Sequence, residues 1–145
     1  MKTKANFTMP KAVKDKWLKA LRSGKYKQGQ GMLRGAEGGY CCLGVLVQEL
    51  DGKIPTTDGC SFSMPTMNFL KRHGIIVIGY APYSEEFRGK NTVRVADSGC
   101  FEVFCGRPEE SISLPELNDG SEIPHRAPYT FEQIADIIEE QVEGY

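Results

Sequence analysis

The string CCLGVLVQEL occupies residues 41–50 and decides how the rest of the chain can pack. It is apolar nearly all round until its last turn, which predicts a central helix that is buried on every side. Asp51 and Gly52 follow it and end it. Gly44 lies inside this helix at a cost of about 1 kcal/mol relative to alanine. The usual reason to accept that cost is the close approach of another backbone, which we therefore expect at Gly44.

Three more segments predict helices, at residues 10–23, 65–73 and 131–142. The first begins with a proline, which suits a first helical turn, and ends just before Gly24. The second is bounded by Ser63 as a cap and by Gly74 as a stop. The third follows Thr130, whose spacing to Gln133 is that of a capping box.

The remaining segments alternate with the period of β-strands or lack a period. Strands are predicted at residues 30–34, 75–80, 92–96 and 100–104. The last two flank Asp97-Ser98-Gly99, which predicts a hairpin, whereas residues 106–128 contain four prolines and are predicted to be irregular. The chain therefore predicts a single α+β domain over residues 1–145, with three to four helices packed on a small antiparallel sheet. Its expected core contains Trp17, Leu21, Leu43, Val45, Leu46, Ile134 and Ile138.

The formal net charge of −1 hides a strong asymmetry along the chain. Residues 1–34 contain ten lysines and arginines against one acid, and residues 102–145 contain eleven acids against two arginines. We expect the two ends to lie close together and neutralise each other, because charge runs usually mark solvated faces. The alternative is that the basic end attracts an anion, such as a phosphate-bearing ligand. Nucleic-acid binding is the weaker reading, since the overall charge is near zero and no recognition helix stands out.

The segment GKYKQGQGMLRGAEGGY, residues 24–40, is the best candidate for a binding site. Its glycines let backbone N–H groups converge on an anion, and the helix N-terminus that follows attracts negative charge. It is neither a Walker A motif nor a dinucleotide fingerprint. The alternative is a hairpin that needs glycine for its turns. The predicted ligand-binding residues are Lys25, Tyr26, Lys27, Gln28, Gln30, Arg34, Tyr40 and, from the Asn-Asp-Gly turn further along, Asp119.

The five cysteines are Cys41, Cys42, Cys60, Cys100 and Cys105. Their odd number, and the lack of an apolar leader before them, argue for free thiols rather than a secreted disulfide framework. Cys41 begins a helix, where the pKa of a thiol can fall, and with His125 and Asn118 it makes up the residue types of a cysteine hydrolase. No hydrolase signature surrounds it, so no catalytic residue is predicted. No metal-ligand spacing is present, and neither a metal nor a cofactor is expected.

Two segments carry a family resemblance. The strings KWLKALRSGKYKQGQGMLRG…GYCCLGVL, within residues 16–46, and LPELNDG…TFEQIADIIEE, within residues 114–140, resemble a group of small uncharacterised proteins of tailed phages and prophages. The resemblance covers both ends of the chain and brings no catalytic residues with it. It implies a phage gene product that acts in the host bacterial cytoplasm, in a setting where accessory proteins counter host defence.

Together these patterns predict a non-enzymatic phage accessory protein that binds a small phosphorylated or nucleotide-like ligand, as a sponge for a host defence signal would. One alternative is a protein-binding inhibitor of a host defence protein. A further alternative is a cysteine-dependent hydrolase. No run of the ~18 apolar residues needed to cross a bilayer is present, so no membrane partner is expected, and a homo-oligomer is compatible with the sequence.

Overall fold

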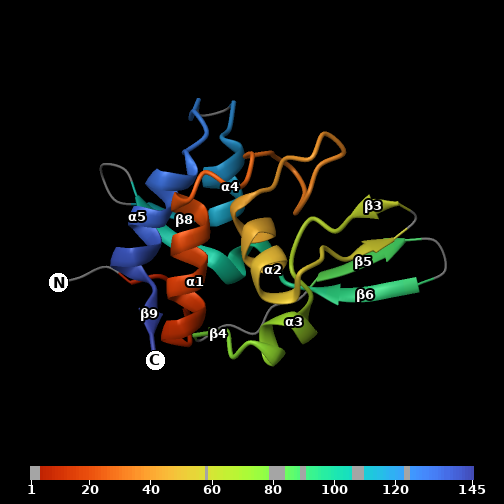
Figure 1. Cartoon of the computed structure of the whole chain (residues 1–145), viewed down its shortest axis with the longest axis horizontal. Coiled ribbons are helices and arrows are strands. Elements are labelled where there is room, and N and C mark those ends of the chain that lie inside the picture. Colours follow the sequence, from red (N-terminus) through yellow and green to blue (C-terminus); the bar gives the residue numbers. More distant parts are fainter. Residues whose placement is uncertain (1–3, 58, 79–83, 89–90, 106–109, 123–124) are drawn as a thin grey trace.

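The computed structural model describes residues 4–57, 59–78, 84–88, 91–105, 110–122 and 125–145. This part of the chain forms a single α+β domain, which confirms the predicted class (Figure 1). Its α-helices are α1 (Lys11–Arg22), α2 (Cys42–Asp51), α3 (Met67–Arg72), α4 (Leu114–Asp119) and α5 (Phe131–Gln141). Within the described ranges, no helix has the length and apolarity that a membrane span requires.

Four of these helices lie where the sequence places them, and their ends explain why. At the start of α5 the Thr130 hydroxyl accepts a hydrogen bond from Gln133 N at 3.2 Å, and Gln133 Oε1 accepts one from Thr130 N at 2.9 Å. The predicted capping box is thereby confirmed. The predicted cap of α3 was wrong, because Thr66 rather than Ser63 accepts the hydrogen bond from Phe69 N, at 3.1 Å.

The fifth helix, α4, falls in the segment that was predicted to be irregular. Ser113 caps it by accepting a hydrogen bond from Glu116 N at 3.3 Å, and its proline lies in the first turn. A proline is tolerated there because that N–H has no helical partner to lose. With six residues, α4 is too short to show a helical period. The proline count was therefore misleading, and the helix number is five instead of three or four.

The sheets are small and mixed, where one antiparallel sheet was expected. The three-stranded sheet has the order β4 (Ile76–Val77), β1 (Phe7–Met9) and β9 (Glu143–Gly144). β1 runs antiparallel to β4 and parallel to β9, so it joins the two ends of the described chain. The other pairs are antiparallel: β2 (Thr56–Thr57) with β3 (Cys60–Ser61), β5 (Ser84–Arg88) with β6 (Asn91–Val95), and β7 (Glu102–Cys105) with β8 (Glu110–Ser113).

The hairpin predicted across Asp97-Ser98-Gly99 was wrong. Its two strands pair elsewhere, β6 with β5 and β7 with β8. Asp97 instead begins a 3₁₀ helix, η1 (Ser98–Phe101), where its carboxylate accepts a hydrogen bond from Gly99 N at 3.0 Å. An aspartate before a glycine suits a helix cap as well as a turn. The strand predicted at residues 30–34 is also absent, and only isolated bridges to Tyr40 occur there. The strand predicted at residues 75–80 is shorter, and residues 79–80 lie outside the described ranges.

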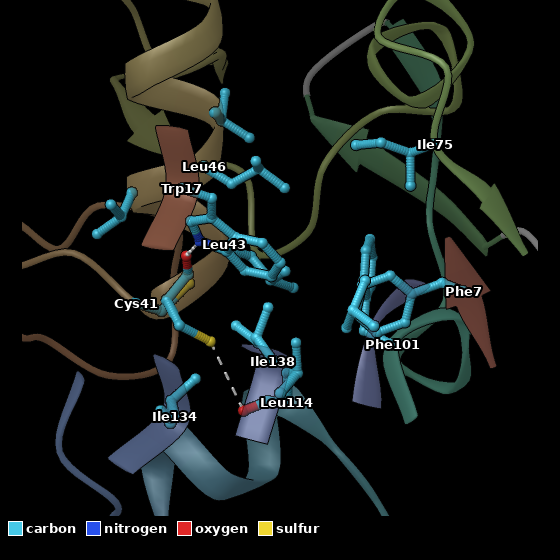
Figure 2. Packing of buried hydrophobic residues seen from close by; sticks show 14 of the residues in the cluster. Phe7, Trp17, Cys41, Leu43, Leu46, Ile75, Phe101, Leu114, Ile134 and Ile138 are labelled. Carbon is cyan, nitrogen blue, oxygen red and sulfur yellow. Dashed lines mark hydrogen bonds between the residues drawn. The ribbon is translucent and has the colours of Figure 1, made fainter. Parts of the chain in front are cut away.

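The core is the one that the sequence predicts. All seven residues expected there are at most 3% exposed and belong to one cluster. α1 lies between α5 and α2 (Figure 1). Trp17 of α1 is buried among side chains of α2 and α5, and its indole Nε1 donates a hydrogen bond to Cys42 O at 2.9 Å (Figure 2). The buried indole therefore has the partner that it needs.

The fold also brings together the oppositely charged ends of the chain. Arg22 contacts Asp136 at 2.8 Å and Glu139 at 3.0 Å, and Lys4 contacts Glu143 at 3.3 Å. The expectation that the basic and acidic ends lie together is confirmed, and neutralisation is seen at Lys4 and Arg22. These N-terminal cations are consequently engaged within the protein.

Candidate anion-binding site

Backbone contacts within the glycine-rich segment, residues 24–40, use amides that were expected to face an anion. Gly29 N donates to Tyr40 O at 2.7 Å, and Gly35 N donates to Gly39 O at 2.8 Å. A side chain at Gly29 would place its Cβ only 2.7 Å from the carbonyl carbon of Gly39. Gly29 and Gly39 therefore permit close contact between two stretches of backbone.

Asn118, which is fully buried on α4, anchors the segment. Its Oδ1 accepts hydrogen bonds from Gln28 Nε2 at 3.0 Å and from Cys42 N at 3.2 Å, while its Nδ2 donates to Gly29 O at 2.8 Å. Gln28 Nε2 also donates to Tyr129 O at 2.7 Å. Gln28, predicted to bind a ligand, is thus held inside the protein by Asn118 and the backbone.

The first amides of α2 are occupied in the same way. Cys42 N donates to Asn118, and Gly44 N donates to Cys41 Sγ at 3.3 Å. Beside them Asp119 Oδ1 accepts a hydrogen bond from Gly31 N at 3.1 Å, so this predicted ligand residue also holds the loop. These backbone donors, which were expected to bind an anion, are bonded internally. They are therefore not free to contact a ligand.

Cys41 is in no position to act as a hydrolase nucleophile. Burial raises the pKa of its thiol to about 11, so the thiol stays protonated at neutral pH. Figure 2 shows it among the core side chains. His125 is exposed on a turn, and no hydrogen bond among the described residues joins it to Cys41. Asn118 bonds the loop and α2, so the three residue types do not form a catalytic set.

The two predicted cations that lie beside aromatic rings, Lys25 and Arg34, differ in whether a carboxylate lies next to them. Tyr26 and Tyr40 pack edge to face with ring centroids 4.9 Å apart. Lys25 Nζ lies 5.3 Å from the Tyr26 centroid and 3.9 Å from the Glu49 carboxylate, which partly neutralises it. The Arg34 guanidinium lies 5.6 Å from the Tyr40 centroid and, within the described part of the chain, forms no ion pair. Arg34 thus offers a charge beside an aromatic ring.

Arg34 and Tyr40 line a hollow of about 590 Å³ between the glycine-rich segment, the end of α2 and the β2–β3 hairpin. Gln48, Lys53 and Ser61 also line it. No carboxylate occurs among the described lining residues, whereas two cations do. The volume lies within the range of small-molecule sites, roughly 300–1,000 Å³. The hollow therefore combines two positive charges with an aromatic ring and amide and hydroxyl groups.

The sequence reasoning found Arg34 and Tyr40 but missed Gln48 and Lys53. Lys53 follows α2 and lies near the glycine-rich segment only because of the tertiary fold. A single lysine after a helix does not indicate a binding site. Lys27 and Gln30 line an adjoining hollow of about 440 Å³ together with Glu37, and the two hollows share Met32, Gly35 and Ala36. The eight predicted residues are therefore not one site. They divide into Arg34 and Tyr40 at the first hollow, Lys27 and Gln30 at the second, Gln28 and Asp119 as loop anchors, and Lys25 and Tyr26 beside Glu49.

The thiols offer no metal centre among the residues that are described. All five cysteines are free, with Cys60 exposed in the first hollow. In the described ranges no three side chains of His, Cys, Asp or Glu gather as a metal ion requires.

Comparison with known families gave one match. Residues 9–55 are similar to a family described as Domain of unknown function (DUF8296). The matched segment covers α1, the glycine-rich loop and α2, and it contains Arg34, Tyr40, Gln48 and Lys53 of the first hollow. No curated protein and no solved structure matches the chain.

Proposed function

We propose that this protein is a non-enzymatic binding protein that takes a small phosphorylated or nucleotide-like ligand in the hollow beside Arg34. The carrying observation is the lining itself: Arg34 and Lys53 face the same 590 Å³ space, and its described wall has no carboxylate to oppose them. Two cations that line one hollow suit the several oxygens of a phosphate group.

The Tyr40 ring supports the nucleotide class over inorganic phosphate. An aromatic face stacks on a base at a gain of roughly 1–3 kcal/mol, and stacking tolerates every base. The adjacent Arg34 guanidinium can contact both the ring and a phosphate. The amide of Gln48 adds donor and acceptor groups for a sugar or a base edge.

The resemblance to small phage and prophage proteins supports a biological setting for this binding. In that setting the protein acts in the cytoplasm of the host bacterium and lowers the free concentration of a nucleotide signal. A sponge of this kind needs affinity and abundance, and it needs no chemical step.

Isothermal titration calorimetry with phosphate, mononucleotides and cyclic nucleotides tests the proposal. A charge-assisted hydrogen bond contributes about 1.5–3 kcal/mol, so Arg34→Ala and Lys53→Ala should each weaken binding at least about tenfold. Lys16→Ala on α1 is the matched control and should leave the affinity unchanged, as should Cys41→Ser. If no nucleotide binds, or if neither basic substitution matters, the proposal fails. A loss confined to Lys27→Ala would place the ligand in the second hollow instead.

One observation favours the protein-binding alternative. Ile76 and Ile78 are 53% and 57% exposed, and β4 is the edge strand of its sheet. Edge strands are templates for pairing with another chain. Ile76→Lys should abolish capture of a host protein in this alternative and leave nucleotide binding intact. Pull-down from a bacterial lysate with both forms separates the two functions.

A further inference from the structure

The hollow beside Arg34 does not end at Lys53. It shares Lys53 and Thr56 with a neighbouring hollow of about 390 Å³. That hollow in turn shares Thr66 and Arg72 with a third hollow of about 480 Å³. Because neighbouring hollows share lining residues, the three follow one another from the glycine-rich segment past the end of α2 to α3 and β6, and we call this series the groove. The β2–β3 and β5–β6 hairpins lie on the side of the molecule away from the two termini (Figure 1).

Positive side chains follow this groove along its length. They are Arg34, Lys53, Lys71, Arg72 and Arg94. The one carboxylate among the described lining residues is Asp51, which contacts Arg72 Nη2 at 2.5 Å and His73 Nε2 at 2.7 Å. Arg94 lies opposite Glu85 in the β5–β6 ladder. Even with these acids counted, cations outnumber carboxylates along the groove.

The overall charge of −1 conceals this groove. Two acids of α5, Asp136 and Glu139, pair with Arg22 of the N-terminal segment. These two acids are therefore partly compensated where they lie. A charged ligand responds to the local potential of a lined cleft, which is what focuses field lines. Net charge is thus a poor reason to exclude a polyanion here.

We infer that the groove binds a short single-stranded oligonucleotide, with its first nucleotide beside Arg34 and Tyr40 and its later phosphates toward Lys71. This inference rests on the proposed function and extends it, because it names the class of ligand. A mononucleotide can occupy the first hollow alone, and it leaves the cations of the other two unused. Only a ligand with repeated phosphates places charge beside all of them. A base can stack on Tyr40 only if it is not already stacked and paired in a duplex, so the ring favours a single strand over a duplex.

Fluorescence anisotropy with labelled oligothymidylates of one to six nucleotides tests this inference. Affinity should rise at least about tenfold from the mononucleotide to the tetranucleotide, since each added phosphate can make a charge-assisted contact with a cation of the groove. With about three phosphate contacts, the logarithm of the binding constant should fall with the logarithm of salt at a slope near −2.

Lys71→Ala distinguishes binding along the whole groove from binding in the first hollow alone. Lys71 is exposed on α3, so its removal should not change the melting temperature. It should weaken the tetranucleotide at least about threefold and leave the mononucleotide unchanged, whereas Arg34→Ala should weaken both. Lys16→Ala should affect neither.

The outcomes distinguish the two proposals. If the mononucleotide binds and depends on Arg34, but length and Lys71→Ala have no effect, the groove inference fails and the proposed function stands. If neither nucleotide binds, the proposed function fails with it. Equal or tighter binding of a duplex or of polyglutamate would also overturn the inference, since it would show a ligand that needs no stacked base.

Discussion

Gly44 shows how a single residue fixes the distance between two segments. A Cβ built there would lie 1.8 Å from Leu33 O, closer than any real contact. The predicted approach of another backbone is confirmed. Gly44→Ala would favour the helix by about 1 kcal/mol, but the overlap must push α2 away from the loop. We expect a net loss of about 1–3 kcal/mol in the free energy of unfolding, measured in urea.

Gly35→Ala is the matched control for that substitution. Its Cβ would meet only Gly39 O, at 3.8 Å, which is ordinary contact. Its effect should stay within about 0.5 kcal/mol. Equal losses in the two variants would show that close contact with Leu33 is not what makes Gly44→Ala destabilising.

At the scale of elements, α4 holds the glycine-rich segment through one amide. Asn118→Ala would leave Cys42 N and Gly29 O without their partner in a buried place. An unsatisfied buried group costs about 1–3 kcal/mol, so unfolding in urea should show a loss of at least that size. Hydrogen exchange should accelerate in residues 28–31. Asp119→Ala removes from a half-buried site the acceptor of Gly31 N and Asn118 Nδ2, and it should cost less; a larger loss there would contradict the role given to Asn118.

At the scale of the whole molecule, alkaline pH tests how well the core excludes water. Burial raises the pKa of Cys41 from 9.0 to about 11. The folded state therefore keeps this proton to a higher pH than the unfolded chain does. The stability contributed by the neutral thiol is fully present below about pH 9 and is lost as the pH rises toward 11, at up to about 1.4 kcal/mol per pH unit.

Urea unfolding between pH 8 and pH 11 measures this loss. Burial also raises the pKa values of Cys42, Cys100 and Tyr26, so variants must be compared with each other. Cys41→Ser should flatten the decline, and Cys60→Ser, at an exposed thiol, should leave it as steep as before. Identical slopes in both variants would mean that Cys41 already meets water in the folded state.

The sequence by itself determined the helices with strong periodicity, the shared core and the close contact at Gly44. Each depends on residues within a few positions of one another: the stripe of α1, the capping box at Thr130, the apolar run of α2. It also determined that the basic N-terminal part and the acidic C-terminal part lie together, as the contacts of Arg22 on α1 with α5 show, because each part has a large excess of one sign of charge. The tertiary structure decided the strand pairing, since β6 could pair on either side and Asp97 suits a cap or a turn equally well.

Only the tertiary structure decided which predicted site residues lie together. Lys53 lines the first hollow together with Arg34 because the fold brings the end of α2 and the β2–β3 hairpin against the glycine-rich segment. No pattern in the neighbouring sequence indicates that these two residues lie close together. Asn118 was read as part of a turn, yet it occupies the amides that the sequence had assigned to an anion. Side-chain chemistry can be read along a chain, but whether a donor is free or already bonded depends on contacts between distant segments.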